Sequence, residues 1–396
     1  MEPYPPNLPV VAHVHTVFLP PTEHWIARLT AGVRDFRHVA LSARLHDTPP
    51  GSDAAHVRHF PHGLEAVAAH RLHVKRRHRY LSALRLIVAG GVAGASLRRL
   101  RAAKLRPDIV HVHFGDVAWR WRRLLNRLDV PIVVSFYGHD YGTLPQRDPR
   151  WRSRLEWVLA KADLLLAEAP RAASRLVALG ADARKVRVIN LGTALPDPER
   201  LPARHPGAHF LQVATLTPKK AQIDTLRAFE VIAASHPDAT VTFVGGDGDA
   251  AFAKSFRAAV AASPYAHRVS VRPFAPLAEL GELFARADYF VQPSVTAEDG
   301  DSEGGAPIAL LDAQAHGLPV IVSDHCDLPY VSAELGWNRP VPAGDVEALA
   351  RVMGAGLLRS VEERLSDRSA SRRFVEEDFD VTDWSAALGR AYRSLL

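Results

Sequence analysis

The chain has 396 residues, of which 47% are hydrophobic and 23% charged, with a formal net charge of +6 and one cysteine. This length suggests two domains, and the composition excludes a disordered or low-complexity chain. Because a single cysteine cannot form an internal disulfide and the N-terminus lacks a signal-peptide pattern, we expect a cytoplasmic protein.

Short apolar runs alternate with helical stretches through the first half of the chain. The predicted strands cover residues 10–18, 109–114, 131–138, 163–169 and 185–192. Runs that are apolar on both faces are typical of parallel strands buried between helix layers. Their alternation with helices predicts an α/β fold with a doubly wound, Rossmann-like sheet.

The segment 71–104 is the most cationic part of the chain. Residues 1–200 hold 31 Lys and Arg against 17 Asp and Glu, and no acid occurs between Glu65 and Asp108. Two interpretations stay open: solvated basic helices, or a surface for anionic lipid headgroups or a diphosphate-bearing acceptor at the inner face of the cell membrane. Nucleic acid is disfavoured as a partner, because no aromatic-interleaved or zinc-finger-like pattern accompanies the charge.

The proline-rich segment 193–208 predicts a domain boundary, after which the alternation starts again. The second set of predicted strands covers residues 209–216, 239–246, 269–274, 289–294 and 319–324. We therefore expect two doubly wound domains, residues 1–197 and 198–375, facing a central cleft. A final helix over 376–396, with apolar residues at helical spacing, would pack back across the domains.

Two segments of the second half suit a phosphate. In SEGGAPIALLDAQAHG (302–317), the glycines allow a ligand close to the backbone, and Pro307 fits the first turn of a helix. The amides and the dipole at a helix start favour an anion. Lys219 and Lys220 follow the strand that ends near residue 216 and could reach a diphosphate. The alternatives are a routine helix start and a solvated lysine pair.

These motifs in this order, with VRPFAPLAELGELFARADYFVQPS (271–294), resemble the donor domain of family 4 retaining glycosyltransferases of the GT-B fold. The segments DIVHVHFGDVAW, PIVVSFYGHDYG and 158–193 resemble the acceptor domain of that family. The resemblance implies transfer of a hexose-type sugar from a nucleoside-diphosphate sugar to a hydroxyl of a glycan or lipid-linked acceptor, as in surface polysaccharide synthesis. It implies no cofactor and no metal.

Carried over position by position, the resemblance implies that Lys220 contacts the donor diphosphate and that Glu303 lies beside the transferred sugar. Asp312 would bind the ribose hydroxyls. Further contacts to the base and to the sugar or phosphate are implied for Phe274 and for the amides of Gly304, Gly305 and Ala306. The sequence departs from the family at Thr215, where an arginine is usual, and at Asp312, which replaces a glutamate and lies one residue farther along.

In the first half, Tyr137 stands where many relatives have a histidine that faces the reacting sugar. That role could pass to Tyr137, His139 or His113. We expect His111 and His113 to point to opposite faces of their strand, with one buried for structural reasons and His113 facing the cleft.

Thr22 and Glu23 fall in the first strand-to-helix loop. They either touch the acceptor or cap the following helix.

Two other functions remain open, a GT-B-fold sugar-nucleotide epimerase and a non-catalytic nucleotide-sugar binding protein. The acidic run DGDSE (299–303) is more typical of a hydrated turn than of a cation site.

Overall fold

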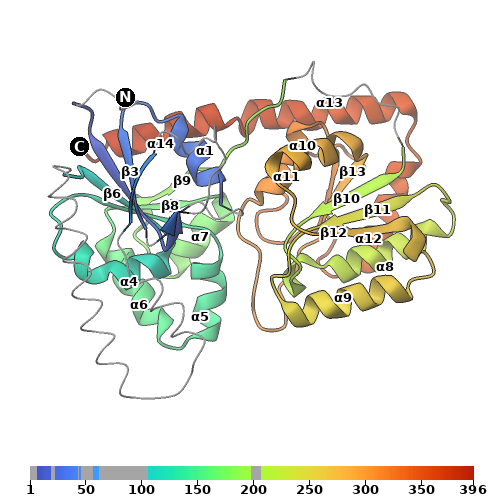
Figure 1. Ribbon diagram of the computed structural model, residues 1–396, viewed down its shortest axis with the longest axis horizontal. Helices are drawn as coiled ribbons and strands as arrows, with labels where there is room; N and C mark the ends of the chain where they lie inside the picture. The colour runs from blue at the N-terminus through green and yellow to red at the C-terminus, as the bar shows by residue number, and fades with distance from the viewer. Residues whose placement is uncertain (1–6, 19–22, 43, 46–56, 62–105, 198–206) are drawn as a thin grey trace. The chain divides into compact units, whose positions relative to one another are not determined.

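The computed structural model describes residues 7–18, 23–42, 44–45, 57–61, 106–197 and 207–396 (Figure 1). Thr22 and the basic segment 71–104 lie outside the described residues. The chain forms two compact units, the first made of residues 1–168, 173–189 and 381–396, and the second of 169–172 and 190–380. The main division therefore falls at Ile189–Asn190, eight residues before the boundary expected from the proline-rich segment.

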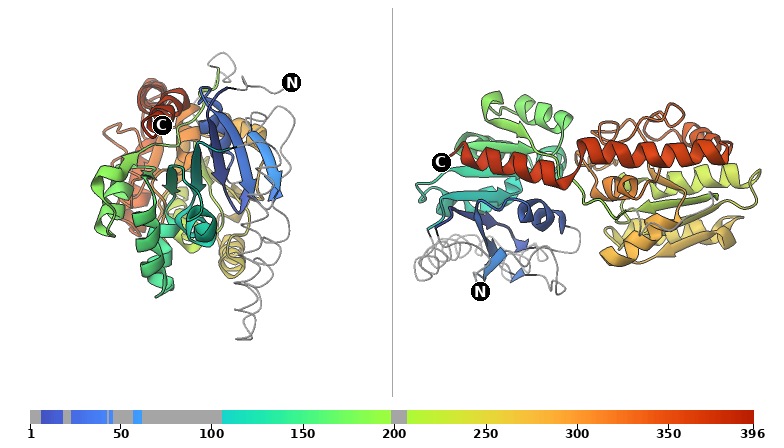
Figure 2. Two further views of the ribbon diagram at one scale, coloured as in Figure 1. Left: turned by 90° about the vertical axis from the view of Figure 1, so that its left-hand side faces the viewer. Right: turned by 90° about the horizontal axis from the view of Figure 1, so that it is seen from above.

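The first unit is built on a parallel seven-stranded sheet. Its strands in spatial order are β5 (Val57–Pro61), β3 (Arg37–Ser42), β1 (Val10–Val14), β6 (Ile109–His113), β7 (Ile132–Phe136), β8 (Leu164–Ala167) and β9 (Val186–Val188). Several of them lie side by side in the left view of Figure 2. A second, two-stranded sheet pairs β2 (Val17–Phe18) with β4 (Arg44–Leu45). The predicted doubly wound parallel sheet is confirmed, and β3, β4 and β5 add to the predicted strands.

Helices and strands of this unit pack together in apolar clusters, one of which includes α14. Phe36, Ile109 and Val133 pack with Leu388 and Tyr392 of α14 (Val381–Arg393). Other helices of the described chain are α1 (Trp25–Ala31), α4 (Gly115–Leu125), α5 (Leu144–Arg147), α6 (Trp151–Lys161) and α7 (Pro170–Ala178). The first three residues of α7 group with the second unit.

The second unit has a parallel five-stranded sheet in the order β12 (Val269–Arg272), β11 (Thr240–Val244), β10 (His209–Val213), β13 (Tyr289–Gln292) and β14 (Val320–Val322). Successive side chains enter two separate cores: Phe210 faces α8 (Gln222–Ala233), α9 (Ala250–Ala262) and α12 (Val346–Leu357), and Leu211 faces the other side. The other side carries α10 (Leu277–Arg286), α11 (Ile308–Ala315) and α13 (Val361–Asp378), as Figure 2 shows from above.

The C-terminal segment consists of two helices where one was expected over 376–396. Helix α13 starts with a capping box between Ser360 and Glu363 and runs to Asp378. Phe379, buried in the core of the second unit, leaves helical geometry with φ −132°, and α14 then begins at Val381 in the first unit. The break follows from anchoring Phe379 in one core and Leu388 in the other.

Among the residues that the structure describes, no helix is both long and apolar enough to span a membrane.

Candidate functional site

The lysine loop of the second unit, residues 214–221, directly follows β10 and leads into α8. Residues Pro218–Lys220 form a short 3-10 turn, and Ala221 closes it in the left-handed region with φ 52°. The neighbouring glycine loop, residues 244–249, packs against residues 214–217, just before this turn. A Cβ at Gly245 would lie 2.0 Å from the carbonyl oxygen of Ala214, so only glycine allows this approach. The glycines thus support the lysine loop.

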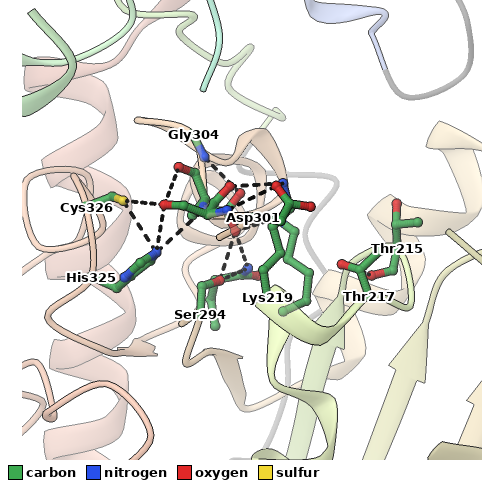
Figure 3. Close-up of polar contacts among 12 residues, drawn as sticks. Thr215, Thr217, Lys219, Ser294, Asp301, Gly304, His325 and Cys326 are labelled. Carbon is green, nitrogen blue, oxygen red and sulfur yellow. Dashed lines mark hydrogen bonds and ion pairs between the residues drawn. The ribbon is translucent and has the colours of Figure 1, made fainter. Parts of the chain in front are cut away.

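Lys220 forms an ion pair with Glu303, from the segment that follows β13. Figure 3 shows the polar contacts of this region, with Lys219, Ser294 and Asp301 labelled. The same carboxylate oxygen of Glu303 accepts from the Ser294 hydroxyl at 2.8 Å and from Gln292 Nε2 at 3.2 Å. Burial of Glu303 opposes its ionised form, but the charges of Lys220 and Lys219 and these hydrogen bonds outweigh that effect and lower its pKa. Glu303 is therefore a carboxylate at neutral pH.

Lys219 lies beside this pair. Its ammonium is 3.2 Å from an Asp301 carboxylate oxygen and donates to the Ser302 carbonyl at 3.0 Å. Both lysine side chains keep some exposure, 20% for Lys219 and 15% for Lys220. The loop thus presents two partly exposed positive charges, each held by an acid of residues 301–303, which is a suitable arrangement for a bound anion.

Sequence reasoning did not find the groups that surround Glu303 from the loop after β14. His325 Nε2 lies 3.4 Å from the Glu303 amide, 3.3 Å from the Ser302 hydroxyl and 3.4 Å from the Cys326 thiol. Burial lowers the pKa of His325 and raises that of Cys326, so both are neutral. A neutral imidazole with its lone pair toward the Glu303 amide fixes the backbone there.

The other expected donor residues lie on α11, just before it, and after strands β10 and β12. Gly304 donates to its neighbour Glu303 at 3.3 Å, and Gly305 and Ala306 are buried just before the helix. Asp312 is buried on α11 and accepts a hydrogen bond from the Thr193 hydroxyl. The Phe274 ring, 47% exposed, follows β12. The Thr215 carbonyl accepts from Gln222 Nε2 at 3.0 Å in the lysine loop.

The first unit holds the expected residues His113 and Tyr137 together. Tyr137 Oη lies 2.8 Å from His113 Nδ1, and their rings are nearly parallel. The expectation that His111 and His113 face opposite ways is wrong: their ring centroids are 4.3 Å apart, because residues two apart on a strand point to the same face. Both are buried. His139, by contrast, is exposed at the start of a π-helical turn.

Two further groups surround this pair. Glu23 is 2.8 Å from His15 Nε2, which gives it a partner within the first unit. Buried Asp140 accepts from the Gly115 amide at 2.7 Å and so holds the start of α4. Burial raises the Asp140 pKa to about 7, against the opposing effect of the Gly115 hydrogen bond. Neither Asp140 nor the histidines of β1 and β3 were among the residues expected from sequence.

Two family models match separate parts of the chain. The model described as Glycosyltransferase Family 4 matches residues 45–195, and the one described as Glycosyl transferases group 1 matches residues 207–357.

Among curated proteins, the chain is 31% identical over 267 residues to an amylovoran biosynthesis glycosyltransferase of Erwinia amylovora, covering 64% of this chain and 62% of that protein. It therefore matches less than two thirds of that relative. A putative colanic acid biosynthesis glycosyltransferase of Escherichia coli K12 is 27% identical over 70% of this chain and 68% of its own length.

Solved structures match nearly the whole chain. Anabaena Alr3699/HepE in complex with UDP-glucose has a TM-score of 0.72 at 14% identity, covering 98% of this chain and 100% of that one. Sucrose-phosphate synthase of Thermosynechococcus elongatus has a TM-score of 0.72 at 17% identity, covering 98% and 99%. At such identities the likeness shows the shared fold.

Proposed function

We propose that this two-domain glycosyltransferase, with a family 4 domain before a group 1 domain, transfers a hexose-type sugar from a nucleoside-diphosphate sugar to a hydroxyl of a surface polysaccharide or its lipid-linked precursor. The observation that carries this proposal is the lysine loop held against Glu303 at the approach to α11. The names of the amylovoran and colanic acid relatives support a polysaccharide acceptor. The UDP-glucose complex of a protein with the same fold supports a uridine diphosphate donor.

The lysine loop would stabilise the leaving diphosphate. Loss of the diphosphate places negative charge on its oxygens, and preorganised ammonium groups and amides lower the energy of that charge. Lys220 would exchange part of its contact with Glu303 for a phosphate oxygen, with Lys219 and the Gly304–Ala306 amides beside it. Glu303, kept ionised by its surroundings, would accept from a sugar hydroxyl. We therefore propose a mechanism that needs no resident metal, with these charges stabilising the diphosphate.

The remaining donor contacts follow from position. Phe274 offers an exposed ring on which the base could stack. Thr215 stands in the loop without the usual arginine, so Lys219 would supply the second positive charge. Asp312 would bind the ribose by sharing its carboxylate with Thr193.

The first unit would orient the reacting sugar and the acceptor through Tyr137, His113 and His139. Burial lowers the pKa of His113 and raises that of Tyr137, each well away from its ordinary value. A low pKa makes His113 a weak base and a high pKa makes Tyr137 a weak acid. We therefore propose retention of configuration, with the leaving phosphate accepting the proton of the attacking hydroxyl. Glu23, with Thr22 beside it in sequence, would contact the acceptor.

Product analysis tests this function. The wild-type protein, Lys220→Met and Lys254→Met are incubated with UDP-, GDP- and dTDP-hexoses and a lipid-linked oligosaccharide fraction. Lys254 is an exposed lysine on α9 and serves as the matched control. In the wild type and in Lys254→Met, we expect release of one nucleoside diphosphate and a product with the same anomeric configuration as the donor sugar. In Lys220→Met we expect neither the release nor the product. A sugar nucleotide of inverted configuration with an intact diphosphate would instead identify an epimerase, and unchanged substrate would identify a binding protein.

A further inference from the structure

A continuous chain of hydrogen bonds runs through three buried imidazoles of the first unit. His38 Nε2 lies 2.9 Å from the Val33 carbonyl oxygen, and His38 Nδ1 lies 2.9 Å from His13 Nε2. His13 Nδ1 is 3.0 Å from His113 Nε2, and His113 Nδ1 is 2.8 Å from Tyr137 Oη. The three rings come from β3, β1 and β6, neighbours in the sheet, and are at most 2% exposed.

The geometry of these rings distinguishes hydrogen bonding from metal binding. One nitrogen each of His13, His111 and His113 lies within 4.8 Å of the others, which is compatible with a three-histidine metal site. However, the His13 and His113 ring centroids are 5.3 Å apart with nitrogens 3.0 Å apart, so the nitrogens lie close to the line between the ring centres. Nitrogens that point at each other suit a hydrogen bond, whereas ligands of one tetrahedral ion converge on a point off that line.

His111 has other partners. Its Nδ1 lies 2.6 Å from Tyr392 Oη and its Nε2 lies 2.7 Å from Ser135 Oγ. Both of its ring nitrogens are therefore used by hydroxyl groups of α14 and β7. Coordination of an ion would break one of these bonds and the His13–His113 bond as well.

The Val33 carbonyl fixes the direction of the whole chain. A carbonyl oxygen only accepts, so His38 must donate to it through Nε2–H. In a neutral ring the other nitrogen then accepts, so His38 Nδ1 accepts from His13 Nε2–H. By the same step, His13 Nδ1 accepts from His113 Nε2–H, and His113 Nδ1 accepts from the Tyr137 hydroxyl. All three neutral imidazoles carry their hydrogen on Nε2.

We infer that the Val33 carbonyl, acting through this chain, turns the Tyr137 hydroxyl inward as a donor, so that a sugar hydroxyl bound at Tyr137 would have to donate to its oxygen. His38 and His13 are positioning residues in this account, since they act on Tyr137 only through His113. The ligand class rests on the proposed function, while the direction of the chain rests on the geometry alone. A phosphate, which needs donors, would be disfavoured at Tyr137.

The surroundings keep His113 neutral and the Tyr137 ring in place. Trp25 and Phe114 pack against that ring with centroids 4.5 Å and 4.8 Å away. Burial lowers the His113 pKa, and neighbouring His111 and His15 lower it further. Burial raises the Tyr137 pKa, against a smaller opposing effect of the Ser135 hydroxyl. A proton added to any of the three rings would make His113 Nδ1 a donor and turn the Tyr137 hydroxyl around.

Nitrogen-15 NMR of histidine-labelled protein tests the direction without any substrate. Chemical shifts distinguish Nε2–H from Nδ1–H tautomers, and single substitutions assign the three rings. We expect only the Nε2–H form at His13, His38 and His113 in the wild type at neutral pH. An Nδ1–H tautomer at His13 or His113, or stoichiometric zinc or nickel bound by the purified protein through these rings, would overturn the inference.

Two variants of one residue test the positioning role. His38→Gln keeps an amide N–H for the Val33 carbonyl and an oxygen for His13, whereas His38→Leu removes both partners. We expect His38→Leu to lose the single tautomer at His113 and to lower the transfer rate roughly five- to tenfold, as for one lost neutral hydrogen bond. His38→Gln should keep the single tautomer at His113 and the wild-type transfer rate. UDP binding should be equal in the wild type and both variants.

Equal transfer rates in His38→Leu and His38→Gln, with tautomers as expected, would overturn the positioning role. Absence of transfer in the wild type would contradict the proposed function instead, and the tautomers would still decide the direction of the chain.

Discussion

Replacement of Lys220 by methionine should destabilise the second unit through Glu303 rather than through the lysine itself. The carboxylate is buried, with a side chain 7% exposed, and Lys220 is the largest charge that lowers its pKa. Removing one member of a buried ion pair typically costs about 3–5 kcal/mol, because the remaining charge stays buried. Ser294 and Gln292 still donate to Glu303, so we expect the lower end, about 3 kcal/mol. For a domain of this size that is roughly 6–12 °C in melting temperature.

The pH dependence of this loss has a definite sign. In the wild type the folded-state pKa of Glu303 is lowered, so its contribution to stability is present above the unfolded pKa and is lost as the pH falls through the folded value. Without Lys220, burial is the dominant effect and raises that pKa, so the variant should lose stability as the pH rises from about 4 toward 7. The difference between wild type and variant should therefore shrink on acidification.

Chemical and thermal denaturation of four proteins measures this effect. Adding Glu303→Gln to Lys220→Met removes the uncompensated charge and should recover most of the lost stability, while Lys254→Met should change it by less than about 0.5 kcal/mol. A double variant as unstable as Lys220→Met, or a single variant whose destabilisation is the same at pH 5 and pH 8, would refute the reasoning.

Three further predictions concern single positions. Asp140→Asn should make the stability of the first unit depend less on pH between about pH 4 and 7. The wild type loses stability as the pH rises through that range, because the folded pKa of Asp140 is raised to about 7. The same pH profile in the variant and the wild type would contradict this assignment. Gly245→Ala should lower both the melting temperature and UDP affinity, because its Cβ would force Ala214, at the start of the lysine loop, away from the glycine loop. Gly246→Ala, whose Cβ meets nothing within 4 Å, is the control. Phe274→Ala should weaken UDP binding roughly tenfold, within the range of one base–aromatic stacking contact, without changing the melting temperature. Equal weakening of pyrophosphate binding would exclude a base contact.

The proximity of Lys220 and Glu303 was predictable, because the sheet topology brings the two segments together. Lys220 follows β10 and Glu303 follows β13, and these strands are neighbours in the sheet although the residues are 83 positions apart. The carboxyl ends of parallel strands share one edge, so loop residues after each strand converge. Asp312 was placed on the right helix, but its contact with Thr193 depends on where the chain passes between the units, which no local pattern indicates.

The histidine chain was not predicted, although a signal exists. Histidines stand at positions 13, 15, 111 and 113, two apart on predicted strands, which places each pair on one face. Strand β3, which supplies His38, was missed because its sequence RHVALS begins with an arginine and a histidine and lacks a long apolar run. The hydrogen bond to the Val33 carbonyl, which sets the direction, depends on the turn after α1 and is visible only in three dimensions.

Calorimetric titration of UDP into the wild type, Lys254→Met and the Lys220→Met/Glu303→Gln variant tests the donor site most directly. The account predicts equal binding to the first two and an affinity lower by roughly 10- to 100-fold in the third, as expected for a lost charge-assisted hydrogen bond. Equal affinity in a folded third protein, or no binding of any nucleoside diphosphate by the wild type, would contradict it.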